Sequence, residues 1–348
     1  MTRSDPQTPS RALVRTAYGG ADVLHVAEVP APSAPLAADE VCVRVHAAAI
    51  CKGDIHVLTG TPYLVRAMGI GLARPKIERF GQEFAGVVEA VGAEVTTVAV
   101  GDAVFGQTPF GRFGAIATEV VVPASSVTPK PDALSFIEAA AMNDSATTAL
   151  QAVRDHGKTS AGSRVLVNGA SGGVGTFAVQ IARALGAEVT AVVRTRNVEA
   201  LRALGFDDVI DATEVDFTRG EARFDGIIDT VGNHAIGALA RVLEKNGTLV
   251  AVSGGPMGNW VGPLAWMARL KLANLFSSRK LTTFVANPND ADRRVLAEFA
   301  REGKVRPVID GVFTLDEAAK AVAHVEEGRT RGKTVVEVLR RPEPAPAP

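Results

Sequence analysis

Short apolar runs rich in β-branched residues, separated by Gly and Pro, fill the first third of the chain. They read ALVRTAY (12–18), VCVRVHAAAI (41–50), FAGVVEAVG (84–92), DAVFG (102–106) and TEVVVP (118–123). Runs of this length between turn residues are typical of β-strands. The pattern predicts an all-β or mixed region up to about residue 135.

From Ser135 the pattern changes to helical. SFIEAAAMNDSATTALQAVRDHG (135–157) begins with Ser135 and Glu138 at the spacing of a capping box and ends at Gly157, which predicts one helix. Strand-like and helix-like segments then alternate from RVLVNGA (164–170) to GTLVAVSGG (247–255). Such alternation predicts a parallel sheet with helices on both faces.

These patterns predict an α/β fold with two domains. A β-rich domain takes residues 1–135 and 286–341, and a doubly wound domain takes residues 136–285. The segment after 285 is too short for a domain of its own, so we expect it to rejoin the N-terminal part. Residues 342–348 are Pro-rich with little apolar surface and are predicted to be disordered.

Composition narrows the function. The net charge of −1 and 22% charged residues give no reason to expect nucleic acid or a membrane surface as a partner. The two cysteines, Cys42 and Cys51, are too few for a disulfide scaffold or a four-cysteine metal lobe. With neither a signal-like nor a membrane-length apolar stretch, we expect a cytoplasmic protein.

The strand ending near residue 169 runs directly into a Gly-rich turn and then a helix. The turn residues are Ala170, Ser171, Gly172, Gly173, Val174 and Gly175. Small residues at a helix N-terminus allow close approach of a pyrophosphate, which predicts a dinucleotide site.

About 20 residues further on, where NAD-binding proteins place an acid, the chain has Arg194, Thr195 and Arg196. Guanidinium groups suit a 2′-phosphate, so NADPH is the expected cofactor. Alternatively, one or both arginines are solvated surface residues.

Three stretches resemble the quinone oxidoreductase branch of the medium-chain dehydrogenase/reductase superfamily. They are SGGVGTFAVQIARALGAEVTAVVRT (171–195), FGQEFAGVVEAVG (80–92) with VGDAVFG (100–106), and GRTRGKTVVEVL (328–339). The resemblance covers roughly residues 12–340. It implies a GroES-like catalytic domain interrupted by a Rossmann domain, with the nicotinamide bound between them.

The resemblance also assigns cofactor contacts by position. Thr148 would approach the nicotinamide, Val231 with Gly232 and Ser253 with Gly254 would end two strands of the site, and Lys333 would face the phosphates. Alternatively, Thr148 is an ordinary helix residue and Lys333 a solvated charge.

Zinc enzymes of this superfamily hold their metal with a Cys, the His of a GHE motif and a later Cys or Asp. The corresponding residues here are Cys51, Gln82 and Asp144. A neutral amide is a poor zinc ligand, so no metal is expected. Asp54 and Glu83 are then interpreted as structural acids with no metal charge to balance.

Without zinc, another group must stabilise negative charge on the substrate oxygen. The candidates are the side chains of Lys52, His56 and Tyr63 and the ribose hydroxyl of the cofactor, with Cys51 at the substrate wall. Structural roles are equally open for His56 and Tyr63, and Lys52 could instead be a phosphate contact or a surface charge. Loop 61–81 is longer than the equivalent loop of a minimal quinone oxidoreductase and would cover either the pocket or the barrel. The segment with Trp260 and Trp266 would form a core or dimer helix or, alternatively, a pocket wall with Trp260 as the ligand contact.

The resulting hypothesis is a zinc-independent homodimeric oxidoreductase that transfers hydride from NADPH to a small activated carbonyl compound, such as a quinone, enone or enal. One alternative is a zinc alcohol dehydrogenase or ketone reductase using Cys51 and Asp144. The other is an NADPH-binding protein without catalysis.

Overall fold

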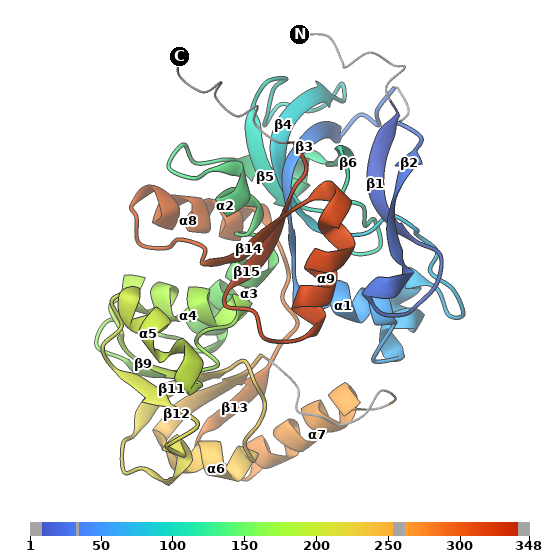
Figure 1. Cartoon of the computed structure of the whole chain (residues 1–348). Coiled ribbons are helices and arrows are strands. Elements are labelled where there is room, and N and C mark those ends of the chain that lie inside the picture. The colour runs from blue at the N-terminus through green and yellow to red at the C-terminus, as the bar shows by residue number, and fades with distance from the viewer. Residues whose placement is uncertain (1–8, 33–34, 253–259, 261, 340–348) are drawn as a thin grey trace.

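The computed structural model describes residues 9–32, 35–252, 260 and 262–339, and it divides their main strands between two sheets (Figure 1). The larger sheet has the order β14-β15-β3-β4-β5-β7, with β6 paired to β3. Its strands are β3 (Glu40–Ile50), β4 (Glu83–Val91), β5 (Ala103–Gln107), β6 (Glu119–Pro123), β7 (Val127–Pro129), β14 (Ile309–Thr314) and β15 (Lys333–Glu337). A separate antiparallel pair joins β1 (Ser10–Arg15) to β2 (Leu24–Val29). The five strands expected from the sequence are present.

The C-terminal segment completes the sheet begun by the N-terminal part. β15 pairs antiparallel with β3 in the register Thr334 with Ile50, and β14 pairs parallel with β15. Helix α9 (Ala318–Glu326) connects these two strands, and its buried residues enter the same core as β3 and β4. The domain limits 1–135, 136–285 and 286–341 themselves stay predictions.

The second sheet is parallel throughout, with the order β10-β9-β8-β11-β12-β13. Its strands are β8 (Arg164–Asn168), β9 (Glu188–Val193), β10 (Val209–Asp211), β11 (Phe224–Asp229), β12 (Leu243–Ala251) and β13 (Lys280–Thr283). The strand order reverses between β8 and β11, where doubly wound sheets bind their ligands. The predicted Rossmann-type sheet is confirmed.

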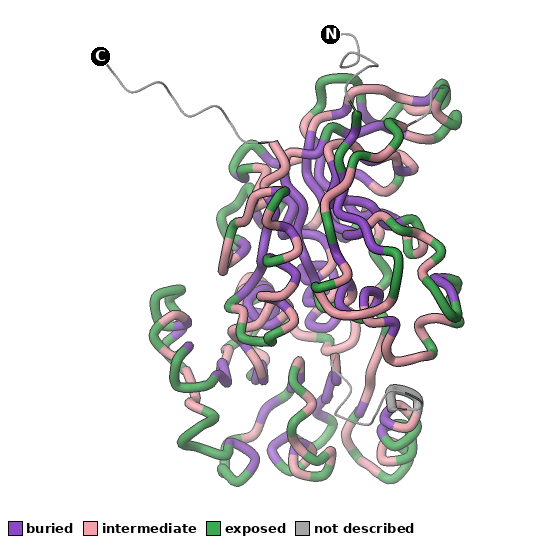
Figure 2. The backbone as a smooth tube through the Cα atoms, turned by 45° about the vertical axis from the view of Figure 1, so that its right-hand side comes forward, coloured by how far each residue is buried: buried purple, intermediate pink, exposed green. Residues whose placement is uncertain are grey.

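Helices cover both faces of this parallel sheet. Val165 and Val167 of β8 pack into a cluster with α4 (Gly173–Ala184) and α5 (Val198–Ala203). Leu166 between them packs on the opposite side with α6 (Ile236–Arg241) and α7 (Gly262–Leu275). Many residues of the strands in both sheets are accordingly buried (Figure 2). None of the described helices has the length and apolarity needed to cross a membrane.

The prediction of one continuous helix over residues 135–157 is wrong. Ser135 and Glu138 do form the capping box, but the helix is divided into α2 (Phe136–Ala140), α3 (Asp144–Leu150) and a π-helical turn, η4 (Gln151–His156). The break lies at Asn143, whose ψ of −93° is not helical and whose buried Nδ2 donates to the Ala140 carbonyl at 3.0 Å. A side chain that bonds its own preceding turn competes with the helical backbone pattern.

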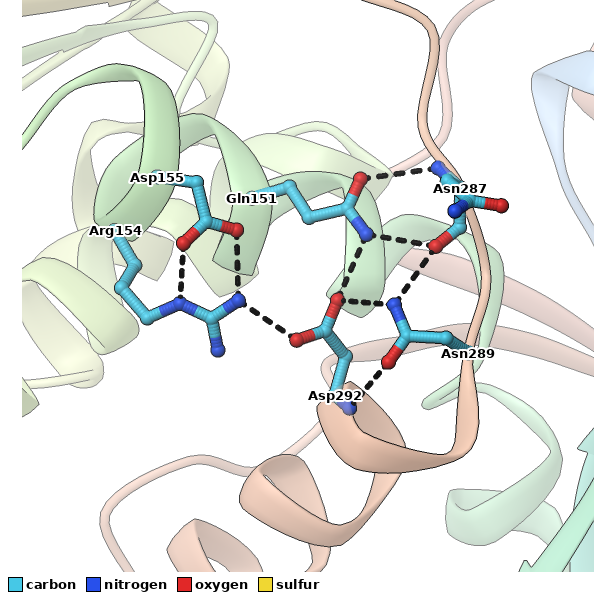
Figure 3. Close-up of polar contacts among 6 residues, drawn as sticks. All are labelled: Gln151, Arg154, Asp155, Asn287, Asn289 and Asp292. Atoms are coloured by element: carbon cyan, nitrogen blue, oxygen red, sulfur yellow. Dashed lines mark hydrogen bonds and ion pairs between the residues drawn. The ribbon is translucent and has the colours of Figure 1, made fainter.

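Helix α8 (Asp290–Arg301) ties the two sheets together. On one side, Asp290 accepts a hydrogen bond from Thr128 of β7 at 2.7 Å. On the other, Asp292 accepts from Gln151 and pairs with Arg154 of η4, both at 2.7 Å (Figure 3). The Gln151 amide also bonds both the N–H and the carbonyl of Asn287. The connection from β13 to α8 is therefore held against η4.

Candidate active site

The Gly-rich turn is a tightly folded connection between β8 and α4. A Cβ atom at Gly175 would lie 2.1 Å from the Gly169 carbonyl oxygen, so only glycine fits there. Gly172 is the N-cap of α4 and donates its N–H to the same oxygen at 3.1 Å. The turn thus brings backbone N–H groups and a helix N-terminus together, as an anion site requires.

Gly169 is a residue of this turn that the sequence interpretation missed. Its φ of +86° lies in the left-handed region, and a Cβ there would lie 2.5 Å from Thr230 Oγ1. Ala170, the first residue of the expected turn, is fully buried. The Asn168-Gly169 pair at the strand end was the available signal, since such pairs mark tight turns.

The expected cofactor residues that follow β9 and β11 lie beside this turn. Asn197 donates from Nδ2 to Ser171 Oγ at 2.8 Å, which fixes the segment containing Arg194, Thr195 and Arg196 next to the turn. All three are exposed, and neither arginine pairs with a carboxylate within the described residues.

At the end of β11, the Val231 and Gly232 N–H groups both donate to Asp229 Oδ1 at 3.1 Å. Asp229 is completely buried and also accepts from Asn168 Nδ2 at 2.9 Å. This carboxylate therefore shapes the ends of β8 and β11 together. Thr148 is half-buried on α3, which packs on α4. Ser253 and Gly254 lie outside the described residues.

Next to the turn, a buried thiol, a buried carboxylate and a half-buried carboxylate lie close together. Cys51 Sγ and one oxygen each of Glu83 and Asp144 all lie within 4.8 Å of one another. They come from the N-cap of α1 (Lys52–Thr59), the start of β4 and the start of α3. Sequence positions far apart thus meet in one cluster.

A buried lysine neutralises this cluster. Lys333 Nζ lies 2.6 Å from Glu83 Oε2 and 3.2 Å from Ser145 Oγ, and the residue is only 2% exposed. Two expectations need correction: Glu83 does have a charge to balance, and the Lys333 ammonium is directed at Glu83 rather than at the phosphates. The aliphatic chain of Lys333 still lies near the turn, because a Cβ at Gly173 would be 3.6 Å from its Cδ.

Burial governs the proton affinities in the cluster. It raises the pKa of the Cys51 thiol well above its usual value, and Asp144, Asp54 and Glu83 raise it further. Burial also raises the pKa of Glu83 to about 7, against the opposing effect of Lys333. Burial alone would lower the pKa of Lys333, but Glu83 keeps it above its usual value. Cys51 is therefore a thiol and Lys333 an ammonium at neutral pH.

The four expected catalytic residues are not gathered in one place. Cys51 belongs to the buried cluster, whereas Lys52 and His56 are exposed on α1. His56 Nδ1 bonds the Thr61 carbonyl at 2.8 Å, and partial desolvation lowers its pKa.

Tyr63 is half-buried and meets Trp260 edge to face, with ring centroids 4.7 Å apart. Trp260 is 77% exposed, while Trp266 is buried in the core beneath α7. Arg66 lies over the Tyr63 ring at 4.8 Å. Loop 61–81 and the start of the α7 segment therefore touch through one aromatic pair, which neither segment alone predicted.

Comparisons with known proteins match both parts of the chain. Residues 37–132 match the family described as alcohol dehydrogenase GroES-like domain, and residues 204–336 match zinc-binding dehydrogenase. The mouse protein NAD(P)H oxidoreductase RTN4IP1, mitochondrial, is 32% identical over 375 residues, covering 97% of this chain and 91% of its own. The trans-enoyl reductase pgmF of Aspergillus terreus is 32% identical over 333 residues, covering 90% of each. A solved quinone oxidoreductase from Coxiella burnetii superimposes with a TM-score of 0.83 at 26% identity, covering 95% of this chain and all of that one.

Proposed function

Because this chain belongs to the medium-chain dehydrogenase/reductase superfamily, whose members are nicotinamide-dependent oxidoreductases, we propose that it reduces a conjugated carbonyl compound with NADPH and without zinc. The acceptor is an enone, an enal or a quinone. The observation that carries this proposal is the buried Lys333–Glu83 ion pair, because it places a cation next to Cys51 and Asp144, which correspond to two of the metal-binding positions of zinc relatives.

The chain's own residues bind and orient the cofactor, which supplies the hydride when bound. The Gly-rich turn fits a dinucleotide because the glycine at position 175, where a Cβ would meet the Gly169 oxygen at 2.1 Å, permits the tight connection from β8 into the N-terminus of α4. The N-terminus of α4 favours the negative pyrophosphate. Val231, Gly232 and Thr148 lie on the elements that adjoin the turn and would position the nicotinamide ribose and ring.

The preference for NADPH rests on Arg194 and Arg196. Both guanidinium groups are exposed beside the turn, and the Asn197 bond to Ser171 fixes their segment there. Neither guanidinium group pairs with a carboxylate among the described residues. A phosphate on the ribose of NADPH would provide the missing anionic partner.

The proposal of a conjugated acceptor rests on how easily different carbonyl compounds accept hydride when no metal polarises their oxygen. An acceptor with a conjugated double bond spreads developing negative charge onto its oxygen and needs less polarisation than a simple ketone. The name of the related trans-enoyl reductase is consistent with such an acceptor. Lys52, His56 and Tyr63 are the exposed or half-exposed groups that would donate to that oxygen or return a proton.

The test is NADPH oxidation, with NADH as the control, against quinones, 2-alkenals, cyclic enones and simple ketones, before and after chelation. We expect chelator-resistant turnover of the conjugated acceptors. Turnover confined to simple ketones and lost on chelation would instead identify a zinc alcohol dehydrogenase. Tight NADPH binding with no turnover of any acceptor would identify a binding protein.

We also propose that two copies of the chain associate through the β13 edge of the parallel sheet. β13 ends the strand order, and the adjoining α7 segment exposes Leu275 at 76% and Phe276 at 86%. An open edge beside exposed apolar side chains is suited to a symmetric contact. Light scattering should give twice the chain mass of 36.2 kDa. Phe276→Glu should give a monomer, and Val312→Glu, at another exposed apolar position, should not.

A further inference from the structure

The zinc implied by the family is a poor fit to the residues present. Glu83 Oε2 pairs with Lys333, and Glu83 Oε1 accepts the Asp144 N–H at 2.5 Å. The Cys51 thiol is hydrogen-bonded to Asp54, and that carboxylate also takes the Cys51 N–H at 2.9 Å. Gln82, at the position of the metal-binding histidine, donates to Asp54 at 3.1 Å. Most of the atoms that would bind zinc already have partners.

The spacing of the three ligand groups, by contrast, is close to what zinc needs. Ligands at about 2.0–2.3 Å from a tetrahedral zinc lie roughly 3.3–3.8 Å from each other. Cys51, Glu83 and Asp144 offer atoms within 4.8 Å of one another, so small side-chain movements would close the set. What opposes a metal is therefore charge and occupancy, and not distance.

We infer that the Lys333 ammonium is a built-in cation that takes the place of the metal, and that removing its charge opens a zinc site at Cys51, Glu83 and Asp144. A divalent ion bound by Glu83 would lie within a few ångströms of this ammonium. Repulsion between two cations is strong where little water screens it. Replacing the lysine by a neutral side chain of similar length removes the repulsion and frees one Glu83 oxygen.

A fixed cation also has a structural consequence that a metal would not have. Lys333 begins β15, and the preceding Gly332 donates its N–H to the Ser171 carbonyl at 2.9 Å. The backbone that carries the ammonium thus supports the Gly-rich turn, while the ammonium itself holds β4 and α3 through Glu83 and Ser145. Two consecutive residues, Gly332 and Lys333, therefore join the Gly-rich turn to β4 and α3.

The experiment measures metal uptake and does not depend on knowing the substrate. Full-length wild-type protein, Lys333→Met and Lys333→Met/Cys51→Ser are incubated with Zn²⁺, or with Co²⁺ as a spectroscopic probe, and then dialysed. Lys333→Met should retain about one metal ion per chain and show a Co²⁺–thiolate charge-transfer band. Wild type should retain only background metal, and the double variant should lose both the metal and the band.

A matched control removes both charges. Lys333→Met/Glu83→Gln lacks the cation but also lacks one ligand, so it should bind no more metal than wild type. If Lys333→Met does not fold, Lys333→Gln carries the same test, since its amide can still bond Glu83 and Ser145 without a charge.

The inference rests on the zinc-independent function proposed above, and the outcomes separate the two. Stoichiometric zinc in the wild-type protein would overturn both. A metal-free wild type whose Lys333→Met and Lys333→Gln variants gain no metal would overturn the inference alone. Metal gained by Lys333→Met but kept in the Cys51→Ser background would also overturn it, because the ion would then be bound elsewhere.

Discussion

The Gly-rich turn and the Lys333 cluster lie next to each other but are prepared for charge in opposite ways. The turn is made from one short stretch of chain, 169–175, and offers backbone N–H groups to an anion that must come from outside. The cluster draws on β3–α1, β4, α3 and β15 and contains its own counterion. The turn is thus open to a ligand, whereas the cluster is already satisfied. Substitutions in each region should therefore have different signatures.

The largest effect should come from Lys333→Met, which leaves Glu83 buried without its cation. Removing one partner of a buried ion pair typically costs about 3–5 kcal/mol in unfolding free energy. Because burial raises the Glu83 pKa to about 7, the protonated carboxyl is the form that the folded state favours. The contribution of Glu83 to the free energy of unfolding is therefore complete below the ordinary pKa of a glutamate, and it is lost as the pH rises through about 7.

Denaturant unfolding of Lys333→Met at several pH values checks this prediction. The loss relative to wild type should be greater near pH 8 than near pH 5, where Glu83 binds a proton. A loss independent of pH would show that packing and not charge explains it. Lys333→Met/Glu83→Gln should recover much of the stability, since neither charge is left unpaired.

A smaller but more selective effect should come from Gly175→Ala. A Cβ placed 2.1 Å from the Gly169 oxygen forces the turn apart, at a cost of about 1–3 kcal/mol. NADPH affinity should fall about tenfold or more, because each 1.4 kcal/mol is a factor of ten. Titration of NADPH fluorescence measures it.

Gly237→Ala is the matched control for this substitution. Gly237 lies in α6, and a Cβ there would meet nothing within 4 Å. It should leave NADPH affinity unchanged and stabilise the protein slightly, by about 0.5–1 kcal/mol, since alanine favours a helix. Equal losses from both glycine variants would contradict the role assigned to the turn.

Arg194→Ala tests the proposal that the segment beside the turn selects NADPH. Loss of a charged hydrogen bond to the 2′-phosphate should cost about 1.5–3 kcal/mol, raising the KM for NADPH at least tenfold. The KM for NADH should not change, because NADH has no such phosphate. Arg196→Ala, compared in the same assay, shows whether the second guanidinium contributes. An equal loss for both cofactors would exclude phosphate recognition.

The smallest effect should come from Asp292→Asn, outside both regions. Burial alone would raise the pKa of Asp292, but hydrogen bonds from Gln151, Arg154 and Asn289 hold it below its usual value. Its stabilising contribution is therefore present above its ordinary pKa and is lost as pH falls below about 4.

The variant should lose about 1–2 kcal/mol at neutral pH, and the difference from wild type should shrink in acid. Thermal unfolding between about pH 3 and 7 measures this difference. NADPH affinity near neutral pH should remain that of wild type. A large change in affinity would show that the contact between α8 and η4 also positions the nucleotide turn.

The features that depend on local periodicity and on small residues could be predicted from the sequence. Alternation of strand and helix patterns was enough for the parallel sheet, and the Ser135–Glu138 spacing was enough for the cap of α2. The Gly-rich turn was found for the same reason, because its geometry is set by consecutive residues. The break at Asn143 was missed, since it depends on a side chain bonding its own turn inside the core.

The arrangement of charges depends instead on long-range packing. Glu83 and Lys333 are 250 positions apart in sequence, yet strand pairing of β15 with β3, and of β3 with β4, brings them into contact. The same long-range packing placed Cys51 among carboxylates and Tyr63 against Trp260. Coulomb interactions depend on distance in space and on burial, and neither quantity is visible along a chain. The sequence therefore identified the Gly-rich turn, while the fold determined which cation occupies the cluster beside it.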